Sequence, residues 1–361
     1  MKYPIKLFFV IVIIALILSL IALKNNGSVE NNDIDIIDDE VQEIIEEETK
    51  VQDKFKLNVS KIGEGECIYN PGKNNGYRYG PSMILNDDGS IDAWFSRPGN
   101  NSTMWDYISY RHMDPDGYWS DEEVVLYPTS GSLDTFSVCD PGVIYFDGYY
   151  YLGYTGTNSS DGLRNQIFVA RSQEPNGYYE KWDGSGWGGD PQPIITYDGI
   201  HWGAGEISFV VQEDQNEMLC YYTWKDENEI SMRCSKVDLT EDWPSTIRFK
   251  CISYHKESEE CSSDVVYYKD KNVYLAFSIG NRMLDNSSLL IHYSFDSKQF
   301  HYLDEYKDIV MEYAHNMGIS KHKNGCISDD ENIDIAYAYS NDNKWGRWKT
   351  CVQGIKISEG N

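Results

Sequence analysis

Positive charge is scarce in this chain. Its 361 residues include 31 Lys and Arg against 58 Asp and Glu, for a formal net charge of −27. A protein that binds nucleic acid needs a basic face, because phosphate groups have to be neutralised. The composition therefore argues against nucleic acid as a partner, and the acidic excess is accounted for by solubility.

Several motifs of well-known chemistry are also missing. The sequence contains no G-x-S-x-G, no H-E-x-x-H and no P-loop, which argues against a serine-hydrolase elbow, a zinc-protease helix and a phosphate cradle. No D-x-D-x-D-G loop is present to hold calcium. After residue 54, no segment has the long apolar stripe of an amphipathic helix. What remains is rich in aromatic residues, with 28 Tyr and 10 Trp, a composition that suits β-structure and stacking on ring-shaped ligands.

The N-terminus has a different composition from the rest of the chain. Residues 7–23 are uncharged and apolar and follow the basic stretch MKYPIK, so residues 1–24 are predicted to be an uncleaved membrane anchor or, as the alternative, a cleaved signal peptide. The positive-inside rule puts the body on the outer side of the cell membrane, or in the medium if the segment is cleaved. Residues 25–54 are strongly acidic and lack aromatics, which predicts a flexible stalk with a helical stretch near VQEIIEEE.

Eight cysteines would then face an oxidising environment, where disulfides persist. Cys220 and Cys234 lie at equal distances from Glu227 in a predicted hairpin and are a candidate pair. Cys251 and Cys261 close a short loop and are another. Reduced, buried cysteines remain the alternative, because connectivity does not follow from sequence.

Residues 55–361 repeat one pattern five times. Each unit has a short apolar strand, a polar turn and an aromatic-rich strand, as in DPGVIYFDGYYYLGYTG, where Asp147-Gly148 is a strong hairpin signal. Units of 53 to 66 residues with three or four strands are typical of propeller blades. We therefore predict an all-β, five-bladed propeller with innermost strands near Met83, Val143, Phe209, Val266 and Ile319. Closure requires residues 55–70 or the C-terminal strand CVQGIKI to complete the last blade.

Innermost strands bring their leading ends to one face of a propeller. Asp140 and Glu206 stand at such ends, and the corresponding positions in the other units are Tyr79-Gly80, Ser263-Asp264 and His315-Asn316. The sequence therefore predicts that acidic residues and a histidine converge at one pocket. If Asp140 and Glu206 share it, mutual repulsion raises the pKa of one of them, and Glu206, near Trp202, is expected to hold the proton.

The segment D-P-G-V-I-Y-F-D-G-Y-Y-Y-L-G-Y-T resembles the corresponding strand pair of the five-bladed propeller glycosidases around glycoside hydrolase families 43, 32, 68 and 117. The resemblance extends from about residue 60 to 355. It implies that Asp140 is the aspartate that orients the sugar and that Glu206, in W-G-A-G-E-I-S, is the general acid. It also implies arabinosyl or xylosyl substrates. No cofactor is required, although a structural Ca²⁺ or Na⁺ ion in the channel fits the family, and no metal ligands are predicted.

One departure is important. The first unit begins Y-R-Y-G-P-S, with Gly80 where the resemblance predicts the catalytic base. Three explanations stay open: the base is Asp264 or Asp134, the Asp140 unit is the functional first blade, or the propeller only binds carbohydrate.

We therefore expect an extracellular glycosidase that hydrolyses glycosidic bonds with paired carboxylates; the alternatives are a carbohydrate-binding or sensor propeller and a transferase or phosphorolytic variant. The oligomeric state is left open. Predicted catalytic residues are Glu206 and Asp140, and predicted substrate-binding residues are Trp202, His201, Tyr79, Arg78, Asp264, His315 and Trp105. Trp94 and Trp187 are further candidates for stacking on sugars, although tryptophans in propellers are more often core residues.

Overall fold

The computed structural model describes residues 55–69, 76–101, 104–240, 242–257, 260–329, 331–341, 344 and 346–360. Residues 58–358 form one compact unit. The predicted membrane segment 1–24 and acidic stalk 25–54 lie outside the described residues and stay predictions. Within the described ranges, no helix has the length and apolar character needed to span a membrane.

The described part is all-β, with two short 3-10 helices, η1 (Glu213–Gln215) and η2 (Trp243–Thr246), as its only helical elements. The strands pair antiparallel in consecutive groups. In chain order the groups are β2 (Tyr79–Leu85), β3 (Ile91–Asn101), β4 (Met104–Met113) and β5 (Glu123–Leu126); β6 (Ser137–Phe146), β7 (Tyr149–Thr157), β8 (Gln166–Ser172) and β9 (Glu180–Lys181); β10 (Gly203–Gln212), β11 (Glu217–Lys225), β12 (Ile230–Asp238) and β13 (Arg248–His255); β14 (Ser263–Tyr268), β15 (Val273–Gly280), β16 (Ser288–Ser294) and β17 (His301–Tyr306); and β18 (Ala314–Lys321), β20 (Ile333–Tyr339) and β21 (Lys349–Glu359).

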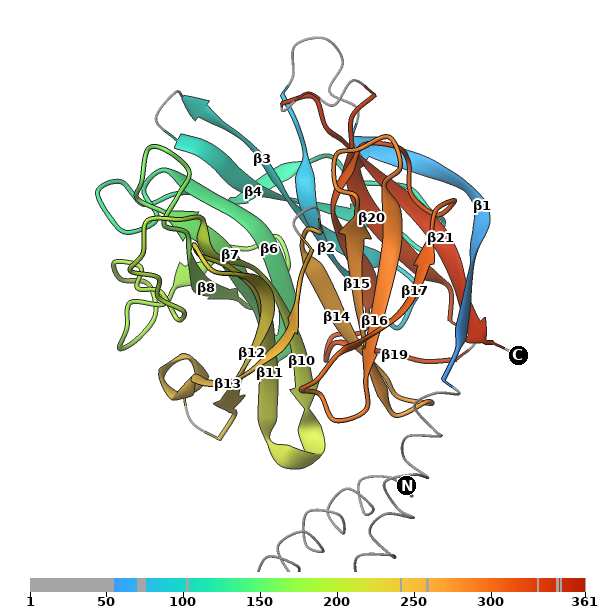
Figure 1. Ribbon diagram of the computed structural model, residues 1–361. Coiled ribbons are helices and arrows are strands. Elements are labelled where there is room, and N and C mark those ends of the chain that lie inside the picture. Colours follow the sequence, from blue (N-terminus) through green and yellow to red (C-terminus); the bar gives the residue numbers. More distant parts are fainter. Residues whose placement is uncertain are drawn as a thin grey trace, which may run out of the picture. The chain divides into compact units, whose positions relative to one another are not determined.

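The first strands of the groups lie side by side in the middle of the molecule (Figure 1). Strand β2 contacts β6, β6 contacts β10, β10 contacts β14, β14 contacts β18, and β18 contacts β2 again. These contacts close a ring, as the first strands of a propeller do. Each of these strands contains the residue around which the sequence predicts an innermost strand, so that prediction is confirmed.

Both ends of the body complete the last group. Strand β1 (Leu57–Tyr69) pairs with the C-terminal strand β21, which pairs with β20. A disulfide between Cys67 and Cys351 also joins β1 to β21. The sequence-based expectation that these two segments close the ring is confirmed, and its physical reason is that pairing removes two exposed sheet edges.

The opening hairpin forms as its residues predict. Strand β6 ends at Phe146 and β7 begins at Tyr149, so Asp147 and Gly148 are the whole connection. Both have positive φ, 48° and 80°, which is the conformation of a type I′ turn and matches the twist of the two strands. This turn fixes the register of β6 and therefore the position of Asp140.

The core lies between neighbouring groups. One cluster combines the first two groups, where Trp94 packs against Tyr150 with ring centroids 6.0 Å apart. Another combines the second and third groups around Tyr151, Phe209 and Trp243. Tyr150 and Tyr151 are consecutive in the second strand β7 and pack on opposite faces, one in each cluster, so an aromatic-rich second strand supplies both cores.

The two predicted cysteine pairs are wrong. In the β11–β12 register Cys220 lies opposite Ser235, and Cys234 lies opposite Tyr221, because the pairing is shifted by one residue from the symmetric one. A shift of one residue turns the side chains to opposite faces. Cys234 instead lies opposite Cys251 of β13. None of the four cysteines of the predicted pairs forms a disulfide.

Candidate active site

Four of the innermost strands carry a bulge at the same place, where the pairing with the second strand shifts register. The residue in the bulge has a positive φ each time: Gly80 (60°), Asp140 (47°), Glu206 (56°) and Asn316 (45°). Left-handed backbone is costly for residues other than glycine and is concentrated at functional sites, and a bulge re-aims the side chain. The fold therefore directs three polar side chains and one bare glycine to a common point.

A pocket lies at that point. It is lined by residues 80–82, 140–142, 206–207, 262–264 and 316–317, which belong to the five innermost strands and the segment just before β14. Its volume is about 20 Å³, enough for about one water molecule. A ligand larger than a water molecule does not fit inside this space.

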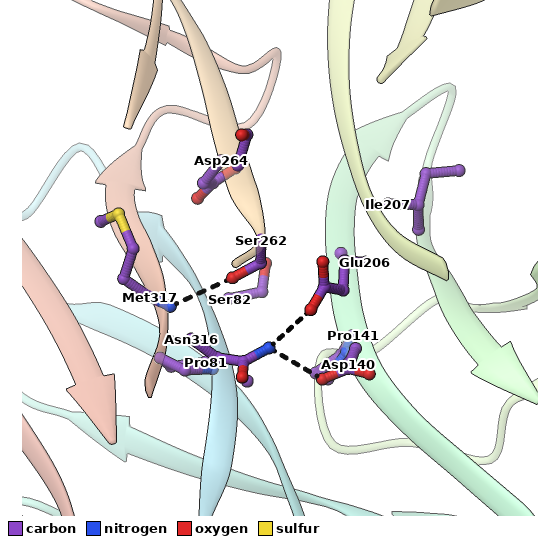
Figure 2. A pocket seen from close by; sticks show the side chains of 13 residues that line it. Pro81, Ser82, Asp140, Pro141, Glu206, Ile207, Ser262, Asp264, Asn316 and Met317 are labelled. Carbon is purple, nitrogen blue, oxygen red and sulfur yellow. Dashed lines mark hydrogen bonds between the residues drawn. The ribbon is translucent and has the colours of Figure 1, made fainter. Parts of the chain in front are cut away.

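The Asn316 amide lies between the carboxyl groups of Asp140 and Glu206 (Figure 2). Its Nδ2 donates to Asp140 Oδ1 at 3.2 Å and to Glu206 Oε1 at 3.1 Å. The backbone N–H groups of the two acids are also fixed, by Ser96 Oγ for Asp140 and Thr155 Oγ1 for Glu206. Asp140 and Glu206 therefore lie in one pocket, and the Asn316 side chain bridges them. The sequence places Asn316 at this point but predicts no role for it.

The two carboxyl groups differ in environment. Asp140 is 8% exposed, whereas Glu206 is half-buried. Burial and the neighbouring charge of Glu206 raise the pKa of Asp140 well above its ordinary value. The expectation that Glu206 would hold the proton is therefore replaced by the opposite one: the more desolvated carboxyl, Asp140, is the better proton holder.

Gly80 has no room for a side chain. A Cβ built on it would lie 2.8 Å from Asp140 Oδ1 and 3.2 Å from Asp140 Cα. The space that a residue of β2 would fill at this point is taken by the carboxyl group of Asp140. A base is therefore absent at residue 80 because the Asp140 carboxyl group occupies the space that its side chain would need.

A third carboxyl group, which the sequence reasoning missed, lies close by. Asp106 of β4 is buried, and it accepts hydrogen bonds from Tyr77 Oη at 2.6 Å and Ser137 Oγ at 2.8 Å. Burial raises the pKa of Asp106 to about 6, and its charge adds to the rise in the pKa of Asp140. No motif marks Asp106, because it reaches the site through the parallel contact of β4 with Ser137 of β6.

The two alternative bases are both engaged elsewhere. Asp264 lines the pocket, but its Oδ1 accepts from Lys321 Nζ at 2.5 Å and from Ser208 Oγ at 2.6 Å. Asp134 is fully buried, pairs with Lys181 at 2.5 Å and is not among the pocket residues. Each of these carboxylates is paired with a lysine, so neither is a good replacement for the base expected at Gly80.

Three of the predicted binding residues stand beside the pocket without lining it. Tyr79 and His315 directly precede Gly80 and Asn316, and their rings stack with centroids 5.9 Å apart. Burial lowers the pKa of His315 well below its ordinary value, so the imidazole is neutral. The indole of Trp202 comes within 2.8 Å of a Cβ built on Gly205, the residue before Glu206.

The remaining predicted residues lie outside the pocket lining. Arg78 binds Glu122 at 2.9 Å, so it does not balance the charge of Glu206. His201 Nε2 lies 3.6 Å from Glu227 Oε2, and the His201 side chain is 41% exposed. Trp105 packs against Phe136 with ring centroids 6.0 Å apart.

The two further tryptophans raised as stacking candidates belong to packing clusters. Trp94 is fully buried and donates to the Pro175 carbonyl at 3.0 Å. Trp187 packs on Trp182 and under the Arg171 guanidinium.

No protein-family model matches the chain, and no curated protein matches it. Solved structures do match. A family 117 glycoside hydrolase of the marine bacterium Zobellia galactanivorans is 15% identical, with 83% of this chain and 90% of that chain covered and a TM-score of 0.59. An α-L-arabinofuranosidase of Podospora anserina, solved with cellotriose, is 12% identical over 84% of this chain and 97% of that chain, with a TM-score of 0.54. The family 62 α-L-arabinofuranosidase domain of Coprinopsis cinerea is 14% identical over 84% and 98%, with a TM-score of 0.53.

These similarities define the class of protein by its fold. The chain has the all-β fold of the propeller glycoside hydrolases, and the resemblance that began with the Asp140 hairpin is confirmed at that level. At 12 to 15% identity the similarity carries the fold alone, so activity has to be argued from the pocket.

Proposed function

We propose that the protein is a glycoside hydrolase whose catalytic pair is Asp140 and Glu206. The observation that carries the proposal is the Asn316 amide, which donates to both carboxyl groups in the lining of one pocket. Hydrolysis of a glycosidic bond needs two such groups, one that protonates the leaving oxygen and one that acts at the anomeric carbon. Arabinosyl and xylosyl substrates are the first candidates, because the structural neighbours include α-L-arabinofuranosidases and a β-xylosidase.

The environments favour a role for each carboxyl group that differs from the one the resemblance implies. Asp140, buried and with a raised pKa, supplies the proton to the glycosidic oxygen as the bond breaks. Glu206, half-buried and closer to solvent, is the group that acts at the anomeric carbon. A pair whose environments push the two pKa values apart divides the acid and the base role in this way.

The separation of the pair favours a double displacement. Because both oxygens accept from one nitrogen, at 3.2 and 3.1 Å, they are closer than the roughly 6.5 Å at which inverting pairs begin. Glu206 would then attack the anomeric carbon as the protonated Asp140 releases the leaving alcohol. Water, deprotonated by Asp140, would hydrolyse the glycosyl ester and restore both groups. The expected product has retained configuration, which proton NMR of the first product formed would show.

Further parts of the proposal concern the whole protein. We infer five blades from the five strand groups and from the ring of contacts between their first strands. An extracellular site, anchored or secreted, is supported by the Cys67–Cys351 disulfide, since disulfides persist in oxidising compartments. We propose that no metal is required, because Lys321 Nζ already binds Asp264, Ser208 and the Val265 carbonyl on the channel side, as a cation would.

The test is a screen of residues 55–361 against aryl glycosides, beginning with arabinosyl and xylosyl groups, followed by two variants on the substrate found. Asp140→Asn should lose most activity on phenyl glycosides and least on dinitrophenyl glycosides, whose leaving group needs no proton. Glu206→Gly should lose activity on both and regain it with azide, which replaces the missing nucleophile. Asp92→Asn, a buried carboxyl of another cluster, is the control. Azide rescue of the Asp140 variant and leaving-group dependence of the Glu206 variant would reverse the roles.

A carbohydrate-binding propeller is the second candidate, favoured by the bare Gly80 at the position expected for the base. It predicts that the unmodified protein binds a glycan in calorimetry and that no anomer of that glycan is ever cleaved.

A further inference from the structure

Asp140 and Asn316 meet across a strand that lies between theirs. Asp140 belongs to β6 and Asn316 to β18, and both strands contact β2. The residue of β2 at this level is Gly80, with φ of 60° in the same kind of bulge. The hydrogen bond from Asn316 Nδ2 to Asp140 Oδ1 therefore passes the place where Gly80 has no side chain.

That place has no room left for one. A Cβ on Gly80 would lie 2.8 Å from the same Oδ1 that accepts from Asn316, and 3.4 Å from Ser96 Oγ, which fixes the Asp140 backbone. Contacts under 3.0 Å between a carbon and an oxygen require movement. Any side chain at residue 80 would push the Asp140 carboxyl away from the Asn316 amide and so from Glu206.

We propose that Gly80 is a positioning residue, whose missing side chain lets Asp140 take the place of a first-blade carboxylate and pair with Glu206 through Asn316. This inference rests on the proposed hydrolase function. In this arrangement the site keeps two acids, both contributed by strands after β2, and Asn316 takes the role of the group that holds them. Gly80 therefore marks a rearranged catalytic site. That site still contains two carboxyl groups, those of Asp140 and Glu206.

The decisive experiment moves the carboxyl group from residue 140 to residue 80. Asp140→Gly should reduce kcat/KM by at least ~100-fold, the scale of a positioned acid–base group. Adding Gly80→Asp to that variant places a carboxyl group in the vacated space, and both exchanges suit the left-handed backbone, which glycine and aspartate tolerate. We expect the double variant to recover at least ~10-fold in kcat, with a pH profile closer to that of the native protein. Gly80→Asp alone should lose activity, because two carboxyl groups then compete for one space.

A matched control separates this effect from backbone strain. Gly89 lies in the hairpin that follows β2, has φ of 87° and has nothing within 4 Å of a built Cβ. Gly89→Ala should leave kcat and KM unchanged. Gly80→Ala should lower kcat at least ~10-fold with little change in KM, since it displaces a catalytic group and not the bound sugar. Equal kinetics of the two alanine variants would overturn the proposal.

A stability cycle tests the geometry without any substrate. Gly80→Ala should lower the urea midpoint of the native protein more than that of the Asp140→Gly variant, because the opposing carboxyl is gone there. If no glycoside is cleaved and this coupling is present, the hydrolase function fails and the geometry holds. If glycosides are cleaved and the coupling is absent, or the double variant stays as inactive as Asp140→Gly, the role of Gly80 is wrong.

Discussion

Two polar clusters in the same channel differ in whether their carboxyl groups are paired with a cation. In one, Asp264 binds the ammonium group of Lys321 at 2.5 Å, and Ser208 Oγ and the backbone N–H of Ile319 complete its hydrogen bonds. In the other, the acid pair Asp140 and Glu206 shares only the neutral amide of Asn316. Asp264 and Asp140 are 7% and 8% exposed, so burial does not distinguish these two carboxyl groups.

The difference distinguishes a structural site from a functional one. The buried Asp264 carboxylate is neutralised by a cation, fully hydrogen-bonded, and links strands β10, β14 and β18. Such a carboxylate stabilises the fold and is a poor acid or base. Among the described residues no cation pairs with Asp140 or Glu206, and burial together with the charge of Glu206 raises the affinity of Asp140 for a proton, a cost that folding alone does not explain. The ion pair therefore holds the strands in place for the acid pair.

The largest expected effect comes from breaking the acid pair. Glu206→Gln should abolish turnover and Asp140→Asn should reduce it at least ~100-fold, while the fold is kept, because each removes a positioned acid–base or nucleophilic group. The measurement is kcat/KM on the substrate from the screen, with circular dichroism as the check on folding. Turnover near the native level in both variants would remove the pair from the mechanism.

Breaking the ion pair should affect stability and not primarily chemistry. Lys321→Met leaves Asp264 buried without its cation, which costs about 3 to 5 kcal/mol for a pair of this kind. Urea unfolding measures this loss. The double variant Lys321→Met with Asp264→Leu should recover much of it, because no charge is then left unpaired. A single variant as stable as the native protein would show that the pair is not structural.

The pH dependence of stability sharpens the contrast. A carboxyl group whose pKa is raised on folding binds a proton in the native state that the unfolded chain has lost, so the free energy of unfolding falls as pH rises from the ordinary value of 3.8 to the folded pKa. Asp106 contributes up to about pH 6. Asp140→Asn should remove the part of this fall that Asp140 causes and make the variant relatively more stable at neutral pH. Unfolding midpoints from pH 4 to 8 test this, and parallel curves for the two proteins would contradict it.

The smallest expected effect concerns metal ions. Because the Lys321 ammonium already fills a cation's place, neither EDTA nor added Ca²⁺ should move the thermal midpoint of the native protein. In Lys321→Ala, added Ca²⁺ or Na⁺ should raise the midpoint, since the space beside Asp264 is open. Loss of stability of the native protein in EDTA would indicate a bound ion elsewhere and would restore the channel metal as a hypothesis.

Part of the site could be found from sequence because it depends on local signals. The D-P-G start and the Asp147-Gly148 turn fix β6, and W-G-A-G-E fixes the start of β10, so Asp140 and Glu206 were both identified and meet as expected. Asn316 was placed at the equivalent position, but its double hydrogen bond depends on distances that no pattern contains. No sequence pattern marks Asp106 as a site residue, because it lies on the third strand of its group and reaches the site only through packing.

The sequence by itself determined the all-β class, the first strands and the two segments that complete the last group, because alternation and turn residues act over a few residues. Only the tertiary structure decided which carboxyl holds the proton, which cysteines face each other and what Gly80 does. A one-residue register shift separated Cys220 from Cys234, and the burial that favours Asp140 over Glu206 arises from strands far apart in the chain. Such effects depend on how the strands pair and pack, which is fixed only when the strands close on one another.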